Sequence, residues 1–277
     1  MNYQKFLPVP ELTPYVECLF EWTGRTEKEL DIQSPPNSFC GMVVNCGAPM
    51  EAYQYTSARA SVPRAFVSGL FTSNYHLVVN GTIHVVGVVF KACAVHDFFG
   101  VRMSTLVNSR MDLNLLPGFG YSLVTAIRQT HAVQSQVALL QGFLLGRLKD
   151  AKTKATVIND VAREIDRLEG NIEVAALAEQ FHISKRYLEK RFLEKVGISP
   201  KMYARIKRFI PLANHVAHAK EVDWQQLVEE GRLHDQSHLI KEFKEFNQAT
   251  PSEYHQNHNE MTRFIKKVRV TKARPPK

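Results

Sequence analysis

A pattern that occurs twice in the C-terminal half constrains this 277-residue chain more than any other feature. Residues 172–192 read IEVAALAEQFHISKRYLEKRF, and residues 222–243 read VDWQQLVEEGRLHDQSHLIKEF. Each copy has an apolar pair, a short interval with a polar residue, and then a leucine and a phenylalanine four residues apart. The pattern predicts two short amphipathic helices joined by a tight turn, which is a helix-turn-helix.

The second helix of each copy has both a start signal and an inward face. Ser184 and Asp235 are residue types that accept the free N–H groups of a helix's first turn, so each is expected to cap its helix. Residues four apart lie on one helical face, where they can anchor the helix to its own core. The anchoring pairs are Leu188 with Phe192 and Leu239 with Phe243.

These anchors determine which side chains face outward. A helix inserted into nucleic acid presents such side chains to base edges and phosphates. The candidate contact residues are Ser184, Lys185, Arg186, Glu189 and Lys190 in the first copy, and Gln236, Ser237, His238 and Lys241 in the second.

Asp235, Ser237 and His238 also have the residue types of a hydrolytic triad. Neighbouring residues on one helix point about 100° apart, so Ser237 and His238 are not placed to relay a proton. A hydrolase nucleophile instead lies on a strained turn and receives its base from elsewhere in the fold. We therefore expect no catalytic residues and no enzymatic activity.

The segment of about 156–256 resembles the DNA-binding domain of the AraC/XylS family of bacterial transcription regulators. The matching text is LAEQFHISKRYLEKRFLEKVGISPKMYARIKRF, followed by DQSHLIKEFKEFNQATPSEYH. The resemblance implies two helix-turn-helix units joined by a central helix, with recognition helices at about 184–195 and 235–246 in successive major grooves. It also implies that Thr250-Pro251 closes the domain.

Three residues depart from the family pattern. His182 and Arg232 stand where the turns usually have glycine, so a backbone with positive φ would be strained there by roughly 1 kcal/mol. Pro211 falls within the expected central helix (201–218), where it removes a hydrogen bond and predicts a kink. The relative placement of the two recognition helices could therefore differ from that in the family.

The N-terminal part, up to about residue 92, reads as short strands separated by turns. Apolar runs occur at 41–45, 64–70, 75–81 and 83–91, and Asn80-Gly81 between the last two predicts a tight hairpin. The stretches PYVECLFEW, PPNSFCGMVVNCG and PRAFVSGLF resemble the uncharacterised β-rich domain that precedes the DNA-binding domain in a subset of the family. Trp22 and the other aromatic residues here are expected to pack in a core, with a ligand pocket as the alternative.

Residues 94–100 are expected to form a short helix, and residues 121–150 one or two longer ones. A stripe of apolar residues follows one face of the latter: Val133, Val137, Leu140, Leu144 and Leu148. Two uses of this stripe remain open, since it could pack against the chain's own β-domain or pair two subunits. Polar residues 150–157 are the expected linker.

Histidine pairs at 215/218, 234/238 and 255/258 have spacings that occur in zinc sites, but no third ligand is evident. Cys18, Cys40, Cys46 and Cys93 lack the paired spacing of a four-cysteine site. We expect reduced thiols, no metal and no cofactor.

Charge supports a polyanion partner for the C-terminal half. Residues 1–150 contain 11 Lys and Arg against 10 Asp and Glu, whereas residues 151–277 contain 24 against 17. The longest apolar runs are too short for a membrane helix, and the N-terminus has no secretory signal. We therefore expect a cytoplasmic protein that does not engage membranes.

Together these features predict an α+β multidomain protein. Residues 1–120 would form an antiparallel β-rich, sensor-like domain with flanking helices, 121–155 a helical segment and linker, 156–258 the all-α double helix-turn-helix domain, and 259–277 a basic, frayed tail. The expected function is sequence-specific transcription regulation on double-stranded DNA. RNA polymerase, a small-molecule effector of unknown identity and a second copy of the chain are further expected partners. The alternative is a small-molecule-binding or protein-interaction protein with a degenerate helix-turn-helix domain.

Overall fold

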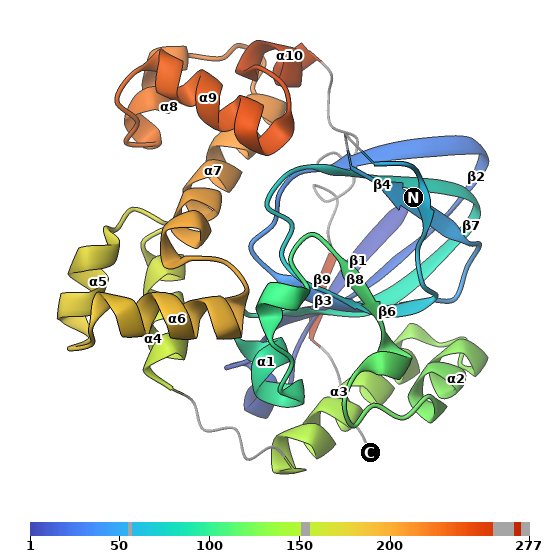
Figure 1. Ribbon diagram of the computed structural model, residues 1–277. Helices are drawn as coiled ribbons and strands as arrows, with labels where there is room; N and C mark the ends of the chain where they lie inside the picture. The colour runs from blue at the N-terminus through green and yellow to red at the C-terminus, as the bar shows by residue number, and fades with distance from the viewer. Residues whose placement is uncertain (55–56, 151–155, 257–268, 273–277) are drawn as a thin grey trace.

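The chain folds into a β-rich N-terminal half and a helical C-terminal half, as expected (Figure 1). The structure is a computed structural model, and it describes residues 1–54, 57–150, 156–256 and 269–272. Its strands join in the order β8-β6-β3-β7-β2-β1-β9, with β4 paired to β7 and β5 to β4. The strands are β1 (Asn2–Leu7), β2 (Val16–Ser34), β3 (Cys40–Asn45), β4 (Met50–Tyr53), β5 (Ala60–Ser61), β6 (Ala65–Ser68), β7 (Tyr75–Phe90), β8 (Arg110–Asp112) and β9 (Arg269–Lys272).

Two long strands, β2 and β7, pair antiparallel along most of their lengths. The register shifts in the middle, where Thr26 pairs with Gly81 and Leu30 pairs with Val79. Gly81 has a φ of +86°, and its N–H donates to Thr26 Oγ1 at 3.2 Å. The predicted hairpin at Asn80-Gly81 is therefore wrong, because pairing with β2 on both sides of Gly81 keeps the chain extended. Gly81 instead lies at the register shift between β2 and β7, and strands commonly bend at such irregularities.

The sheet separates two apolar cores. The larger core runs from the β-domain through α1–α3 into the helical half. The smaller core lies on the other face of the sheet, around Trp22, Ile32, Met50, Val79 and Val85. This second core borders the cavity described below.

Three helices cover one side of the β-domain. They are α1 (Ala94–Phe99), α2 (Ser122–Gln129) and α3 (Val133–Asp150); the 3-10 turns are η1 (Pro10–Leu12), η2 (Met103–Thr105) and η3 (Leu113–Leu115). In α3, Val137, Leu140 and Leu144 are buried, while Val133 and Leu148 pack partly buried against the same core. The apolar stripe therefore belongs to the chain's own core, and the dimer seam considered for it does not fit this structure.

The helical half consists of α4 (Val157–Arg167), α5 (Val174–Gln180), α6 (Lys185–Val196), α7 (Pro200–His218), α8 (Trp224–Glu230), α9 (Gln236–Asn247) and α10 (Pro251–Gln256). In Figure 1, α4–α6 gather around one end of the long helix α7, and α8–α10 gather around its other end. Helix α7 runs on through Pro211. The proline has no N–H for the carbonyl four residues earlier, and the kink expected there stays a prediction. Of the expected linker, residues 151–155 lie outside the described residues, and Thr156 caps α4.

The basic C-terminal tail is described only at residues 269–272. These residues form β9, parallel to the edge strand β1, with Gln4 opposite Arg269 and Leu7 opposite Lys272. For these four residues the expected fraying is wrong, because the free backbone groups of an edge strand provide a partner for a further strand.

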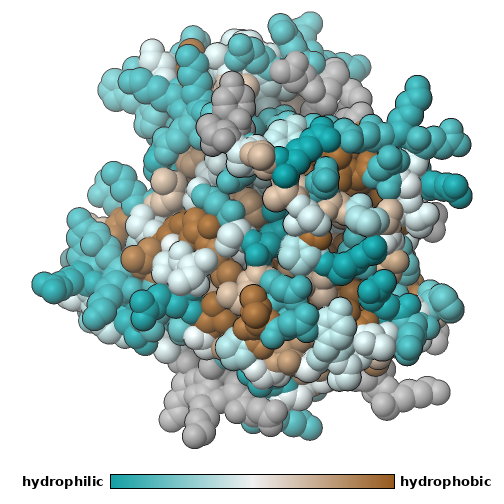
Figure 2. All heavy atoms as spheres, turned by 45° about the vertical axis from the view of Figure 1, so that its right-hand side comes forward, coloured by the Kyte–Doolittle hydropathy of each residue, from teal (hydrophilic) through white to brown (hydrophobic). Residues whose placement is uncertain are grey.

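The surface mixes polar and apolar side chains. Figure 2 shows hydrophilic side chains over most of the outer parts of one face, with apolar side chains in separate patches nearer its centre. Of the helices in the described part of the chain, none combines the length and the hydropathy needed to cross a membrane.

Candidate nucleic-acid interface and cavity

The first helix-turn-helix unit consists of α5 and α6. Ser184 caps α6, because its Oγ accepts a hydrogen bond from the Tyr187 N–H at 3.2 Å. His182, in the turn, has a φ of +51°. The turn therefore uses the left-handed conformation that glycine adopts more easily, as the sequence indicated.

The second unit, α8 and α9, repeats this geometry. Asp235 Oδ1 accepts a hydrogen bond from the His238 N–H at 2.8 Å, and Arg232 has a φ of +46°. The neighbouring Gly231 has an ordinary φ of −76° and is needed for another reason. A Cβ atom at Gly231 would lie 2.7 Å from Leu212 Cδ1, so the absence of a side chain lets this turn approach α7.

The leucine and phenylalanine anchors are buried as predicted. Leu188, Phe192 and Phe243 are fully buried, and Leu239 is 1% exposed. The Phe192 ring lies 5.6 Å from that of Tyr203 on α7, and the Phe243 ring lies 4.9 Å from that of Phe209 on the same helix. Both recognition helices therefore pack on α7, so one continuous helix relates one unit to the other.

A charged contact strengthens the attachment of α9. Arg205 on α7 donates to Glu242 Oε1 at 2.7 Å and to Glu245 Oε2 at 2.6 Å. Its guanidinium also lies 5.1 Å from the ring centre of Phe246. Arg205 thus holds the inward side of α9, opposite to the predicted contact face.

The predicted contact residues mostly face outward. Ser184, Lys185, Arg186, Glu189, Lys190, Gln236, Ser237 and Lys241 are all exposed. His238 is the exception, since it is half-buried and its Nε2 lies 3.5 Å from Glu242 Oε1. Its ring therefore turns towards its own domain rather than fully outward.

Two further exposed side chains share these faces. Tyr187 is 43% exposed on α6, and Ile240 is 39% exposed on α9. The repeat could have identified Ile240, because aligning Leu188 with Leu239 makes Ile240 equivalent to Glu189, which was predicted to face outward. An exposed isoleucine on such a face can contact the methyl group of thymine.

Asp235→Ala is expected to lower the urea midpoint of unfolding at pH 7, because the mutant loses the acceptor for the His238 N–H. That hydrogen bond holds the pKa of the Asp235 carboxyl below its ordinary value. A lowered pKa in the folded state stabilises at neutral pH, and this stabilisation is lost as the pH falls through the lowered value. The difference in urea midpoint between wild type and Asp235→Ala should therefore become smaller as the pH falls. Asp235→Asn, which keeps an acceptor, is the control, and an equal midpoint for all three chains at pH 7 would disprove the cap.

The first unit is fastened to the β-domain by a buried ion pair. Lys195 Nζ lies 2.7 Å from Asp97 Oδ1 of α1, and both side chains are 3% exposed. Lys195 also donates to Asn159 Oδ1 at 2.8 Å and to Thr156 Oγ1 at 3.1 Å, while Asn159 Nδ2 donates to Asp97 Oδ2 at 2.6 Å. The cluster joins α1, α4 and α6. Lys195 lies three residues after Phe192, so its inward position follows from the helical period.

The second unit touches the β-domain at the C-terminal end of α9. The Asn74 N–H donates to the Phe246 carbonyl, and Asn74 Nδ2 donates to the Asn247 carbonyl, both at 2.8 Å. Helix C-termini have carbonyls without helical partners, and Asn74 satisfies two of them. Both recognition helices are therefore held by the N-terminal half.

A cavity of about 540 Å³ lies between the sheet and α7. Its lining is mainly apolar, and volumes of about 300–1,000 Å³ are usual for small-molecule sites. Three lining residues, Ile210, Asn214 and His218, come from one face of α7. Trp22 also lines the cavity and is 6% exposed, so it packs in the smaller core and borders the cavity at once.

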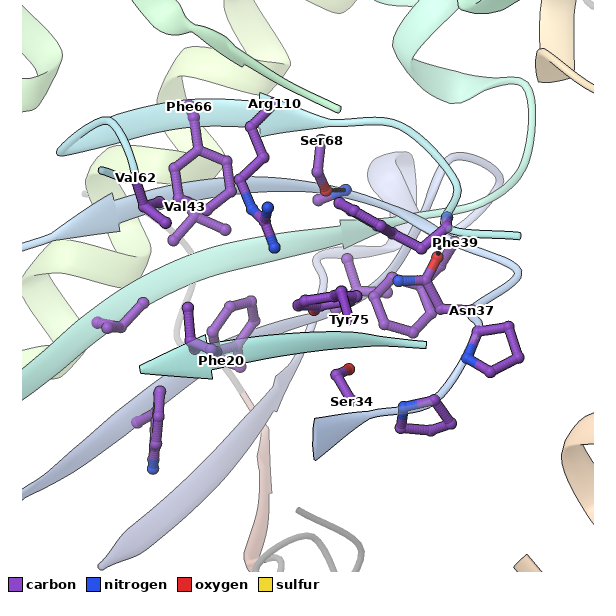
Figure 3. Close-up of a pocket in the computed structure, with 18 of the residues that line it drawn as sticks. Phe20, Ser34, Asn37, Phe39, Val43, Val62, Phe66, Ser68, Tyr75 and Arg110 are labelled. Atoms are coloured by element: carbon purple, nitrogen blue, oxygen red, sulfur yellow. Dashed lines mark hydrogen bonds between the residues drawn. The ribbon is translucent and has the colours of Figure 1, made fainter. Parts of the chain in front are cut away.

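Arg110 is the cationic side chain of β8 in this cavity. Figure 3 shows it extending into the pocket beside Phe66 and Ser68, with Phe20 and Tyr75 across from it. Its guanidinium lies 4.7 Å from the ring centres of Phe71 and Tyr75 and 5.8 Å from that of Phe66. Sequence reasoning missed this residue, because its surroundings come from separate segments of the chain.

The thiols and histidines have ordinary structural roles. All four cysteines are free, and burial raises the pKa of the Cys40 thiol to about 12. His218 Nδ1 lies 2.7 Å from the Asn214 carbonyl, and His255 Nδ1 lies 2.8 Å from the Val216 carbonyl. No cluster of three metal-ligating side chains occurs in the described residues, and His258 falls outside them.

Comparison with protein families gives two matches. A family described as a helix-turn-helix domain matches residues 177–257, and a domain of unknown function, DUF6597, matches residues 4–112. The first spans most of α5 and all of α6–α10, and the second spans β2–β8 with the part of the cavity wall that these strands supply. A search of curated proteins gives no match.

Solved structures give distant matches. ToxT from Vibrio cholerae is 12% identical, with a TM-score of 0.44, covering 86% of this chain and 97% of that one. Unsaturated fatty acid bound ToxT is 14% identical, with a TM-score of 0.43 and coverages of 86% and 94%. The AraC-like transcriptional activator CuxR is 12% identical, with a TM-score of 0.27 and coverages of 82% and 91%.

The helix-turn-helix family match and the repeated, capped units support the same assignment. The chain is a DNA-binding transcription regulator, with a DUF6597 domain ahead of its helix-turn-helix domain.

Proposed function

We propose that α6 and α9 each enter a major groove of one DNA site, and that their exposed side chains read its sequence. The observation that carries this proposal is the pair of matched units, each with its anchors on α7 and its polar side chains outward. Lys185, Arg186 and Lys190 on α6, and Lys241 on α9, supply cations for phosphates and for guanine edges. Gln236 suits an adenine edge.

We further propose that the β-domain, about residues 1–120, senses a small molecule in the cavity, and that residues 156–258 form the DNA-binding unit. Support comes from the cavity wall, since one face of α7 contributes Ile210, Asn214 and His218. The same helix carries both recognition units. Asn74 holds α9, and the adjacent residue, Tyr75, lines the cavity. A ligand that favours one position of α7 or of Tyr75 would therefore shift the DNA-binding equilibrium.

Selection of bound fragments from random DNA, followed by gel-shift titration, tests the DNA proposal. A regulator should retain saturable binding to selected fragments in the presence of unrelated competitor DNA. Binding that is only salt-sensitive and blind to sequence would instead support an interaction protein with a degenerate helix-turn-helix domain.

Arg186→Ala and Lys241→Ala are each expected to weaken the selected site by about 1–3 kcal/mol, because each removes a base contact from an outward face. Gel-shift affinities for selected and unrelated sequences measure the effect. A phosphate-contacting lysine would weaken all sequences about equally, so the loss must be larger on the selected site. Lys28→Ala, an exposed lysine of β2, is the matched control. Unchanged specific binding by both variants would disprove the assignment of the recognition faces.

A further inference from the structure

The cavity contains a cation whose polar partner is missing among the described residues. Arg110 is half-buried, and its close neighbours there are the rings of Phe66, Phe71 and Tyr75. Aromatic faces attract a guanidinium, yet they offer no lone pair in the plane of its N–H groups. Within the described part of the chain, no carboxylate lies within ion-pair distance of Arg110. A guanidinium held in an apolar wall favours an anion that brings its own acceptors.

A hydroxyl lies beside this cation. Ser68 on β6 is the cross-strand partner of Arg110 on β8, so the two side chains share one face of the sheet. Ser68 Oγ accepts the Gly41 N–H at 3.2 Å, which leaves its own O–H free to donate within the described contacts. A guanidinium and a hydroxyl side by side match the two oxygens of one carboxylate.

The rest of the cavity is mainly apolar, although Asn37, Asn214 and His218 also line it. Tyr3 and Phe20 stack with ring centres 5.5 Å apart, and Trp22, Leu77 and Val85 extend the surface. Burial raises the pKa of the Tyr3 hydroxyl, so this residue is neutral at pH 7. An occupant therefore needs one anionic end and an apolar body, because a ligand with charge at both ends would bury one charge without a partner.

We propose that this cavity binds a monocarboxylic acid whose carboxylate pairs with Arg110 and Ser68 and whose apolar body lies against Phe20, Trp22 and Val85. The inference rests on the proposed effector role of the cavity. It also explains why Phe66, Phe71 and Tyr75 lie close to the guanidinium: the rings limit its positions and leave its N–H groups for an anion.

Trp22 provides a direct test, because the chain has only two tryptophans. In a Trp224→Phe chain, the fluorescence of Trp22 reports on the cavity. The ligands are 4-phenylbutyrate, which has an aromatic body, and decanoate, which has an aliphatic one. Each acid is compared with the alcohol of the same length, which has a similar shape but no charge. We expect at least one of the acids to bind ten-fold or more tightly than its alcohol, because only the acid supplies a charged acceptor. Arg110→Gln should remove this preference, whereas Arg128→Gln, an exposed arginine of α2, should keep it.

Equal binding of acid and alcohol by the Trp224→Phe chain overturns the proposal, and so does an acid preference that survives in folded Arg110→Gln. The comparison of acid with alcohol in the Trp224→Phe chain can overturn the proposal even if Arg110→Gln does not fold. The titration contains no DNA, and the gel shifts above contain no ligand. Failure of the carboxylate site is therefore distinguishable from failure of the DNA-reading proposal.

Discussion

Lys195→Met should lower the free energy of unfolding by about 3–5 kcal/mol, because it leaves the Asp97 carboxylate buried without its cation. Both side chains are 3% exposed, so water cannot replace the missing ammonium. The variant also removes donors to Asn159 and Thr156. Urea denaturation followed by circular dichroism measures the loss.

A second substitution separates the effect of the unpaired charge from simple loss of packing. Adding Asp97→Asn to Lys195→Met removes the unpaired charge and keeps an oxygen that can accept the Asn159 amide. The double variant should therefore be clearly more stable than Lys195→Met alone. Exposed Lys190 on the same helix supplies the matched control, since Lys190→Met should change stability by no more than about 0.5 kcal/mol. If Lys195→Met were as stable as wild type, the buried pair would not fasten α6 to α1.

Phe192→Ala and Phe243→Ala are each expected to cost about 3–5 kcal/mol of unfolding free energy. Both rings are fully buried, and each packs against an aromatic ring of α7. Truncation would leave a cavity that neighbouring helices cannot close without moving the recognition helix. Chemical denaturation of each variant measures this cost.

Exposed residues on the same helices provide the comparison for these phenylalanines. Tyr187→Ala on α6 and Ile240→Ala on α9 remove side chains that are 43% and 39% exposed. Each should cost much less than its buried partner, although either could weaken DNA binding. A Phe192→Ala or Phe243→Ala chain that melts like the wild type would show that the repeat was aligned incorrectly.

The helical half was predictable because its signals are local. Caps at Ser184 and Asp235, anchors four residues apart, and turns with positive φ at His182 and Arg232 all fall within one repeated segment. These features depend on the helical period and on backbone sterics, and both can be read from the spacing and the types of nearby residues. The helix bounds at 185–196 and 236–247 differ by one residue from the predicted ones.

The β-domain was less predictable because its decisive contacts are distant in sequence. Asn80-Gly81 has strong local turn propensity, yet pairing with β2 overrides it. Arg110 reads as an ordinary polar residue until β6 and β8 pair and bring it beside Ser68. The α7 wall of the cavity comes from a segment some hundred residues further along the chain. These residues come together only when the whole chain folds, so a short segment of sequence does not reveal their contacts.

The attachment of both recognition helices to the N-terminal half has a consequence for the DNA site. Lys195 fastens the end of α6 to α1, and Asn74 holds the end of α9. In this state both helices are attached to the same half of the chain, so these contacts, together with α7, set their relative position. B-form DNA turns by roughly 34° for each base pair at about 10.5 base pairs per turn. Inserting a single base pair between the two bound segments would therefore rotate one segment away from its helix. While these attachments hold, we expect the protein to bind sites with only one spacing between the segments.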